Sequence, residues 1–251
     1  MSCRIDDISV IVPTRNEARN IPAFLASVHP EVTLIVVDAS DDGTDHLVEH
    51  LRPAKTCVIR SSALIAPARQ LGAAAARTSW LLFSDADVQF EPGYFEVLAA
   101  TVSDHAFYGP KYATVAHTLY SQLFNAGQGT LDRIGIPAAS GSNMGVRRDV
   151  FERAGGFRLD LPVNEDTELM LRLWRRGYRV RYRRELAVRS LDDRRLDIGG
   201  ARKLIHSVSR SALLFANLYL PLPRRWLRHD WGYWRIRHAR RSGLRDVSTH
   251  R

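Results

Sequence analysis

Short apolar runs and polar segments alternate along the first third of the chain. The runs are rich in β-branched residues and end in turn-forming residues, so each predicts a buried β-strand. Between these runs, apolar residues recur three or four positions apart, which predicts amphipathic helices. An example is the set Ile21, Phe24, Leu25 and Val28, with Asn20 as an N-cap. This alternation favours an α/β fold with a mostly parallel, Rossmann-type sheet flanked by helices. The predicted strands are residues 8–12, which Pro13 ends, 33–37, 57–59 and 80–84.

The pattern beyond residue 90 is less regular. A loop of small residues at 139–146 enters a short strand, and the next helix ends at Gly155 and Gly156. Residues 200–219 again show helical apolar spacing. We expect one main α/β domain over residues 1–190 and a helical, basic region over 191–251. The other predicted elements here are helices at 94–101 and 165–177 and a strand at 178–182.

Composition and charge narrow the functional classes. The chain is 45% hydrophobic and 25% charged, which fits a globular protein and excludes collagen-like and disordered classes. Its net charge of +9 is concentrated in residues 220–251, where nine arginines face two aspartates, a net charge of +7. Trp226, Trp231 and Trp234 lie between these arginines and suit a membrane headgroup region. The alternative is that they pack on the domain or on a partner subunit. No nucleic-acid-binding motif is present, and no nucleic acid partner is expected.

The two cysteines and the N-terminus bear on the compartment. Cys3 and Cys57 are far apart and match no metal-ligand spacing, which favours a reducing environment, and we expect Cys57 to be buried. An aspartate pair interrupts the N-terminal apolar run, and no stretch is apolar enough to span a bilayer. The expectation is a cytoplasmic protein, with peripheral contact to the inner face of the membrane as an option.

Three polar loops follow predicted strands and should meet at one edge of the sheet. They are residues 13–17, 38–44 and 85–87, and ligands bind beyond the carboxyl ends of parallel strands. Asp85 and Asp87 flank one small residue directly after an apolar strand, a spacing suited to a divalent cation and the phosphates it bridges. Mg²⁺ or Mn²⁺ is the expected cofactor. The alternative is that these aspartates begin an ordinary surface loop.

At this point the chain resembles the family-2 glycosyltransferases, whose nucleotide-binding half has the GT-A architecture. The resemblance covers about residues 8–185, and its motifs occur in the expected order. They are VIVPTRNEARNI at 10–21, VVDASDDGT at 36–44, ARQLGAAAA at 68–76, LFSDADV at 82–88, GSNMGVRRDVFERAGGF at 141–157 and NEDTELMLRLWRRGY at 164–178.

The resemblance implies roles for the donor-side residues. Pro13, Thr14 and Glu17 look like the loop that contacts the nucleotide, and Asp38 like the acid at the base or ribose. Arg69 resembles the family's arginine near the diphosphate, where a planar guanidinium can donate two hydrogen bonds to phosphate oxygens. Asp85 would contact the ribose or metal, and Asp87 would ligate the metal. The alternatives are that Pro13 only ends a strand and that Arg69 is a solvated helix residue. The sequence departs from the family at Ala39, Ser40, Asp41 and Asp42, where a second acid and Gly-Ser are usual.

The resemblance also places the catalytic base at Glu165-Asp166. We assign the base to Asp166, with Glu165 as second choice; a helix cap is the alternative role for Asp166. Direct displacement by the deprotonated acceptor would invert the anomeric centre. Ser142 and Asn143, after Gly141, would line the donor-sugar or acceptor pocket. Arg194 and Arg195 resemble a pair of arginines that binds the diphosphate in some family members. An ordinary charged loop is an equally favoured interpretation of this pair. His206 is expected to be structural rather than a metal ligand.

The expected function is transfer of a hexose-type sugar from a UDP-, GDP- or dTDP-linked donor to a hydroxyl, which a lipid carrier can present. A sugar-phosphate nucleotidyltransferase is a rival, but it would need a glycine-rich loop after the first strand, and residues 13–20 contain no glycine. A non-enzymatic membrane- or nucleic-acid-binding module is the other rival. It leaves the converging acids without a role, because carboxylates repel phosphate unless a metal is present.

Overall fold

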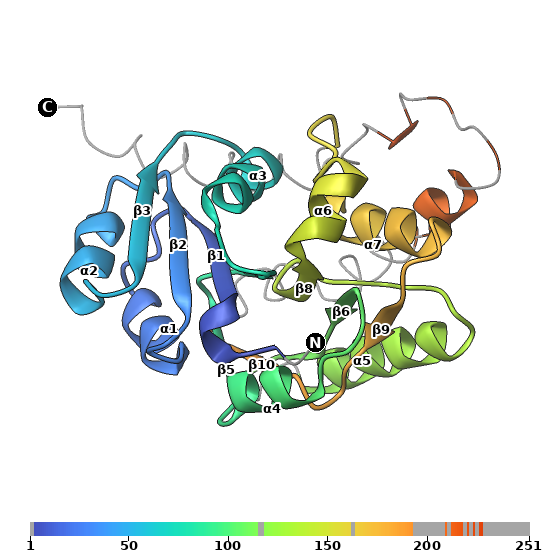
Figure 1. Cartoon of the computed structure of the whole chain (residues 1–251), viewed down its shortest axis with the longest axis horizontal. Helices are drawn as coiled ribbons and strands as arrows, with labels where there is room; N and C mark the ends of the chain where they lie inside the picture. Colours follow the sequence, from blue (N-terminus) through green and yellow to red (C-terminus); the bar gives the residue numbers. More distant parts are fainter. Residues whose placement is uncertain are drawn as a thin grey trace, which may run out of the picture.

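A seven-stranded sheet runs through the centre of the protein (Figure 1), in the order β3-β2-β1-β4-β8-β6-β9. The computed structural model describes residues 3–114, 118–161, 164–192, 209, 212–217, 220, 223 and 226–227. The first four strands of this order are parallel, and β8 alone runs against its neighbours β4 and β6. The strands are β1 Ile8–Thr14, β2 Thr33–Asp38, β3 Thr56–Arg60, β4 Trp80–Ser84, β6 Ala106–Tyr108, β8 Asn143–Arg147 and β9 Val180–Tyr182.

Helices cover both faces of this sheet. Alternate residues of a strand point to opposite faces, so Val10 and Val12 pack with Phe24 of α1 while Ile11 packs with the group that includes α3 and α7. The central strands are therefore apolar at nearly every position. The helices are the short 3-10 turn η1 Ile5–Asp7 and α1 Ile21–Ser27, α2 Thr44–Leu51, α3 Ile65–Ala75, α4 Tyr94–Thr101, α5 Thr118–Arg133, α6 Arg148–Ala154 and α7 Glu165–Arg175.

A second, three-stranded sheet joins distant parts of the chain. It has the order β5-β10-β7, with β5 Val88–Phe90, β7 Lys111–Tyr112 and β10 Val188–Ser190. The Leu191 N–H donates to the Asp87 carbonyl at 2.7 Å, so the end of this sheet is fixed beside the Asp85–Asp87 segment. Three elements from very different positions in the sequence thus surround one aspartate.

The parallel α/β prediction is confirmed, but the end of the first strand was placed wrongly. Pro13 does not end β1; it lies inside the strand, opposite Val37. Thr14 O accepts a hydrogen bond from Ala39 on the β2 side, and alternate residues face opposite neighbours, so the Pro13 nitrogen faces β4. Pairing of β1 with β4 has already ended at Ile11. Proline therefore occupies a position where no N–H is required.

Cys57 is exposed, so its predicted burial is wrong. It lies on β3, the edge strand, and shares a face with Ile59. That face is covered by α3, which packs mainly over β1 and β2, and Cys57 at the edge remains exposed. Cys3 near the N-terminus is buried.

Only part of the expected C-terminal region falls within the described residues. Helical residues occur at 209 and 212–217, and Leu214 and Leu227 pack with Leu161 and Leu171 in a small apolar cluster. Trp226 is half-exposed there, while Trp231 and Trp234 lie outside the described residues. In the part of the chain that the structure describes, no helix combines the length and hydrophobicity needed to cross a bilayer.

Candidate active site

The predicted polar loops meet at one edge of the central sheet. In the parallel ladder Thr14 is level with Asp38, and β4 ends beside them at Ser84. Because β8 is antiparallel, its first residue, Asn143, lies opposite Ser84. The loop that enters β8 therefore meets the loop that leaves β4. The antiparallel strand brings the second half of the sequence to the edge where the first half places its acids.

Asp38 organises the loops after β1 and β2. Its carboxylate is buried and accepts hydrogen bonds from the Thr14 hydroxyl and from the Ser40 N–H and hydroxyl. Ser40 Oγ in turn accepts from the Asn16 N–H at 2.8 Å. The Glu17 N–H donates to Thr44 Oγ1. These contacts fix the shape of the rim where the nucleotide is expected, and they engage Asp38 within the protein.

Arg69 is buried and bridges two acids. Its Nη2 donates to Asp85 Oδ1 at 2.8 Å and its Nη1 to Glu165 Oε1 at 2.6 Å. The other oxygen of Asp85 accepts from the Ser142 hydroxyl at 2.6 Å. A Cβ built on Gly141 would lie 2.3 Å from Arg69 Nη1, so the loop can pass over the guanidinium only because residue 141 has no side chain. Arg69 is therefore not the solvated helix residue that the alternative predicted.

Asp166 lies next to this ion-paired group, at the start of α7. Its Oδ2 accepts from the Gly141 N–H and its Oδ1 from the Thr167 N–H, both at 2.6 Å. Glu165 is buried against Arg69, whereas Asp166 is only partly buried. Of the two acids proposed as the base, Asp166 is the more exposed one.

The carboxylates of Asp85, Glu165 and Asp166 lie around the Arg69 guanidinium, and their mutual interactions together with burial determine their pKa values. Burial raises the pKa of Glu165 to about 7, Arg69 opposes that rise and Asp166 adds to it. Burial also raises the pKa of Asp166 above the usual aspartate range, against the lowering effects of Arg69 and of the two backbone N–H donors. Burial disfavours the charge on Arg69, but the surrounding carboxylates outweigh it and raise the pKa of the guanidinium. A carboxylate with a raised pKa is a better proton acceptor in catalysis.

Asp87 faces a lysine that the sequence did not predict. Lys111 Nζ, on β7, is 3.2 Å from Asp87 Oδ1, and the Lys111 carbonyl accepts from the Asn125 side chain of α5. The contacts at this edge form two ionic groups: Arg69 with Asp85 and Glu165, beside Asp166, and Lys111 with Asp87. Together they contain four carboxylates and two cations.

This charge set fits a divalent cation. Fully ionised, the four carboxylates and two cations sum to −2, and a proton on Glu165, whose pKa is about 7, reduces this to −1. Either charge would repel a diphosphate unless a cation is bound. Among the described residues, no three or more His, Cys, Asp or Glu side chains gather into a closed metal site. A donor set of one or two carboxylates suits Mg²⁺ or Mn²⁺, which keep water and phosphate as their other ligands.

Asn143 is buried and acts as a structural hub. Its Oδ1 accepts from the Tyr94 hydroxyl at 2.6 Å, and its Nδ2 donates to the carbonyls of Pro110 and Leu186. One amide therefore ties α4 and the connections around β7 and β10 to the start of β8. The Asn143 side chain is thus engaged within the protein, and its predicted role in lining the donor-sugar or acceptor pocket stays a prediction.

The structure thus brings most of the predicted site residues to one edge and adds two that the sequence did not reveal, Lys111 and Tyr94. Lys111 follows the Gly-Pro pair that ends β6, and this turn signal could have marked it. Arg194, Arg195 and His206 lie outside the described residues. The residues at this edge are Pro13, Thr14, Glu17, Asp38, Arg69, Asp85, Asp87, Ser142, Asn143, Glu165 and Asp166.

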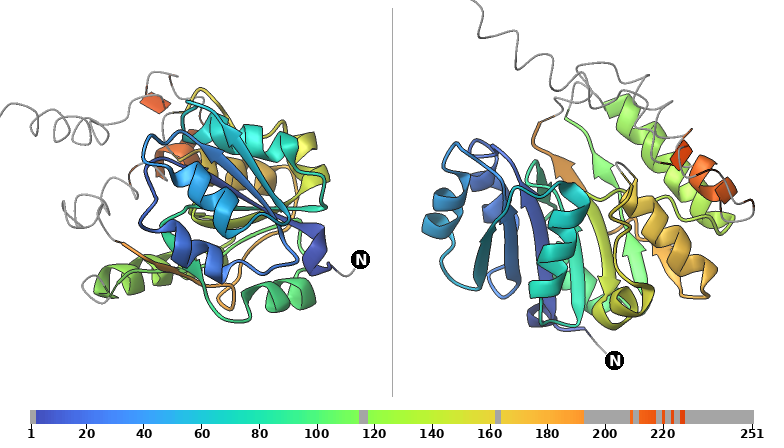
Figure 2. Two further views of the ribbon diagram at one scale, coloured as in Figure 1. Left: turned by 90° about the vertical axis from the view of Figure 1, so that its left-hand side faces the viewer. Right: turned by 90° about the horizontal axis from the view of Figure 1, so that it is seen from above.

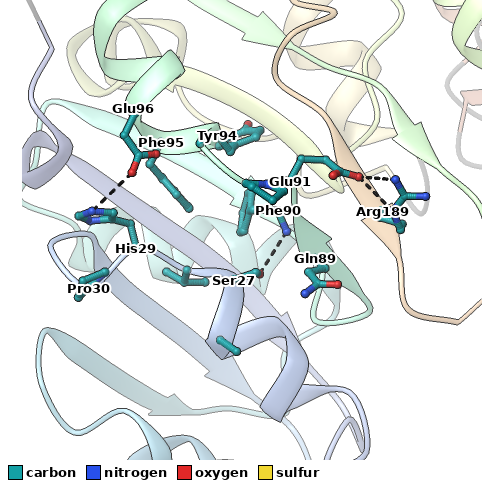
Figure 3. A pocket seen from close by; sticks show the side chains of 14 residues that line it. Ser27, His29, Pro30, Gln89, Phe90, Glu91, Tyr94, Phe95, Glu96 and Arg189 are labelled. Atoms are coloured by element: carbon teal, nitrogen blue, oxygen red, sulfur yellow. Dashed lines mark hydrogen bonds and ion pairs between the residues drawn. The ribbon is translucent and has the colours of Figure 1, made fainter.

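A separate hollow of about 550 Å³ opens between the end of α1 and the start of α4 (Figure 3). Its charged groups pair with each other: His29 lies 3.9 Å from Glu96 and Arg189 lies 2.8 Å from Glu91. None of the predicted site residues lines it. The chemistry therefore does not coincide with this hollow.

Comparison with known proteins agrees with the geometry. The family model for glycosyl transferase family 2 matches residues 9–155. The chain is 26% identical over 200 residues to the succinoglycan biosynthesis protein ExoA of Rhizobium meliloti, covering 68% of this chain and 59% of that protein. It is 25% identical over 186 residues to an uncharacterized glycosyltransferase of Haemophilus influenzae, covering 66% and 61%. The chain spans about three fifths of the length of these relatives.

Solved structures show the same fold at low identity. A mannosyltransferase from Pyrobaculum calidifontis, in complex with GDP-Man and Mn²⁺, superposes with a TM-score of 0.65 at 18% identity, over 97% of this chain and 76% of that one. S. aureus TarS in complex with UDP-GlcNAc gives 0.60 at 19% identity, over 74% and 58%. With the family model matching more than half of its residues, the chain belongs to glycosyl transferase family 2.

Proposed function

We propose that this enzyme transfers a sugar from a nucleoside diphosphate donor to an acceptor hydroxyl with inversion, and that Asp166 is the base. The observation that carries the proposal is the position of Asp166: partly buried but more exposed than Glu165, oriented by two backbone N–H groups, and beside the Asp85–Arg69–Glu165 ion-paired group. Asp166 accepts the acceptor proton while the acceptor oxygen bonds to the anomeric carbon. The bond from that carbon to the diphosphate breaks, and the one displacement inverts the centre.

On the donor side of the site, we assign Asp87 as a ligand of a divalent cation. Asp85 already has both oxygens engaged, by Arg69 and Ser142, so we give Asp85 the task of orienting the loop around residue 141. When bound, the cation supplies Lewis-acid stabilisation of the diphosphate leaving group. The complexes of the two structural neighbours, with GDP-Man and Mn²⁺ and with UDP-GlcNAc, support a nucleotide-sugar donor and a metal for this chain. Pro13, Thr14, Glu17 and Asp38 form the proposed nucleotide rim.

For the acceptor we propose a lipid-linked hydroxyl at the inner face of a membrane. The support is the basic, tryptophan-bearing sequence of residues 220–251, which suits anionic headgroups. Arg194 and Arg195 remain proposed contacts to the diphosphate.

A donor screen tests the reaction. UDP-, GDP- and dTDP-linked sugars are incubated with Mn²⁺, with Mg²⁺ or with a chelator, and hydrolysis or transfer is followed together with the anomeric configuration of the product. Asp166→Asn should bind donor but lose transfer by about 10²–10⁴-fold. Asp87→Ala should lose the metal-dependent part of donor binding.

Glu168→Gln is the matched control. Glu168 lies on the same helix and pairs with Arg172 at 2.9 Å, so its loss should leave transfer near the wild-type rate. The amide of Asp166→Asn would have one acceptor oxygen, whereas Asp166 uses two oxygens to accept from two backbone N–H groups. The variant loses one of these hydrogen bonds, so its stability is measured in parallel. If folded Asp166→Asn transfers within tenfold of wild type, Asp166 is not the base; retention of configuration would exclude single displacement.

A further inference from the structure

Lys111 and Asp87 form an ion pair that the reaction proposed above does not use. Lys111 Nζ lies 3.2 Å from Asp87 Oδ1, and among the described residues no other side chain pairs with this carboxylate. The two side chains are only 23% and 17% exposed, so salt and water screen the pair less than they screen a surface pair. Asp87 is the proposed ligand of the divalent cation. The amine therefore engages an oxygen that this ligand would offer to the cation.

The two cations at this edge are held in different ways. Arg69 makes two ion pairs, is 4% exposed and lies beneath Gly141, where a Cβ would come within 2.3 Å of the guanidinium. Lys111 makes one longer contact through a flexible side chain. Arg69 is therefore fixed in the protein, whereas the Lys111 amine can leave its partner by rotation of its own side chain.

The backbone of both members of the pair is fixed. The Asp87 carbonyl accepts from the Leu191 N–H at 2.7 Å, and the Lys111 carbonyl accepts from Asn125 Nδ2 at 3.2 Å. The inward side of α5 carries buried polar residues, Ser121, Asn125 and Gln128. In the left-hand view of Figure 2, α5 and β10 lie together on the side of the molecule opposite α3. The amine thus reaches the acids from the face opposite Arg69, on a rigid base.

We propose that Lys111 is a positioning residue that makes metal binding depend on the nucleotide: it holds Asp87 in the free enzyme and yields the carboxylate once a nucleoside diphosphate is bound. Like charges repel, so an ammonium beside Asp87 lowers the affinity of that carboxylate for a divalent cation. A diphosphate brings negative charge to the same edge and draws the ammonium away from Asp87. Such coupling is reciprocal, so the cation should also strengthen nucleotide binding. This role of Lys111 rests on the proposed role of Asp87 as a metal ligand.

A purely structural role of the pair predicts the opposite effect on metal affinity. If Lys111 only held Asp87 in place, its loss would loosen the carboxylate and weaken metal binding. If Lys111 competes with the cation, its loss strengthens metal binding in the absence of nucleotide. The sign of the change therefore separates the two roles, and it is measured without any transfer reaction.

Equilibrium dialysis of the full chain against Mn²⁺ tests the proposal, because it counts the Mn²⁺ that the protein retains. Each protein is dialysed alone and with saturating UDP, GDP or dTDP. Lys111→Met removes the charge and keeps a side chain of similar length. Without nucleotide we expect this variant to bind Mn²⁺ about tenfold more tightly than wild type, within the usual range of coupling between two sites. The nucleotide should strengthen Mn²⁺ binding in wild type, and about tenfold less in the variant.

Lys55→Met is the matched control, because it removes the same charge from a lysine that pairs with Glu31 at 2.6 Å but is 41% exposed and lies before β3, away from this edge. Its Mn²⁺ affinity should equal wild type. Lys111→Arg keeps the charge and should restore the weak binding of wild type. Circular dichroism checks that each variant is folded, and Lys111→Gln serves as a second neutral variant with the same expected result.

The outcomes separate this role of Lys111 from the proposed metal site. If neutral variants at Lys111 bind Mn²⁺ no more tightly than wild type while Asp87→Ala loses Mn²⁺ binding, the metal ligand stands and the competing role of Lys111 is wrong. Equal tightening in Lys55→Met would reduce the effect to net charge and also overturn it. If Asp87→Ala binds Mn²⁺ as wild type does, both the metal assignment and the coupling fail.

Discussion

Replacing Arg69 by methionine tests the buried ion-paired group at the centre of the site. The change removes the cation that pairs with Asp85 Oδ1 and Glu165 Oε1, at 2.8 and 2.6 Å, and leaves a side chain of similar reach. Removing one partner of a buried ion pair typically costs about 3–5 kcal/mol, because the remaining charge stays buried without compensation. Two acids lose their partner here, but Glu165 can take up a proton. We therefore expect a loss of about 3 kcal/mol rather than twice that amount.

The sign of the pH dependence follows from Glu165. Its pKa is about 7 in the folded protein and about 4.3 in an unfolded chain, so the folded state holds the proton more tightly. This contribution to stability is fully present below the unfolded value and is lost as pH rises through 7. Without Arg69 the folded pKa rises further, so the loss continues to higher pH in the variant. The destabilisation should be larger near pH 8 than near pH 6, by about 1 kcal/mol.

Urea unfolding followed by tryptophan fluorescence at both pH values measures this. Arg60→Met is the control, because Arg60 also bridges two acids, Asp45 and Glu49, but its side chain is 53% exposed. Exposed pairs contribute up to about 1 kcal/mol. If Arg69→Met costs no more than Arg60→Met, or if its cost does not grow with pH, the buried group does not have the energetic role assigned to it.

Two further predictions concern local structure. Gly141→Ala should lower the free energy of unfolding by about 1–3 kcal/mol, because its Cβ would meet the ion-paired Arg69 guanidinium; Gly127→Ala, in an open position on α5, should instead raise it by about 0.5–1 kcal/mol. Thermal unfolding of the pair shows the contrast, and equal effects would contradict it. Ellman's reagent should modify Cys57 but not Cys3 in the folded protein, because burial, aided by Asp7 and Asp6, raises the pKa of Cys3 to about 11; both thiols should react after denaturation, and a protected Cys57 would contradict the exposed edge of β3.

The parallel half of the fold was readable from the sequence because its signals are local. Each buried strand is a continuous apolar run, and each acid-bearing loop follows such a run directly, as Asp85 follows β4. Arg69 shows what local patterns cannot predict. Its helical spacing from the buried Ala66 and Ala73 indicates an inward position. Its partner Glu165 is 96 residues away in the sequence, and no local pattern predicts that pairing.

The missed parts depend on non-local pairing or on an unusual pattern. Lys111 meets Asp87 only because β7, β10 and β5 form one small sheet, and strands of two or three residues carry almost no periodicity. Helix α5 was not predicted because its inward side is polar. The error at Pro13 came from reading proline as a strand end without knowing that its neighbour β4 stops pairing earlier.

The separation of Arg69 from Glu165 also orders events during synthesis. Translation proceeds at about 5–20 residues per second, so Glu165 is made roughly 5–20 s after Arg69. In that interval β1 to β4 are completed and Asp85 becomes available to the guanidinium, but its second partner, Glu165, does not yet exist. A ribosome stalled between the two would carry a chain that has Arg69 and Asp85 but neither Glu165 nor Asp166, so Arg69 would hold one of its two ion pairs and the proposed base would be missing.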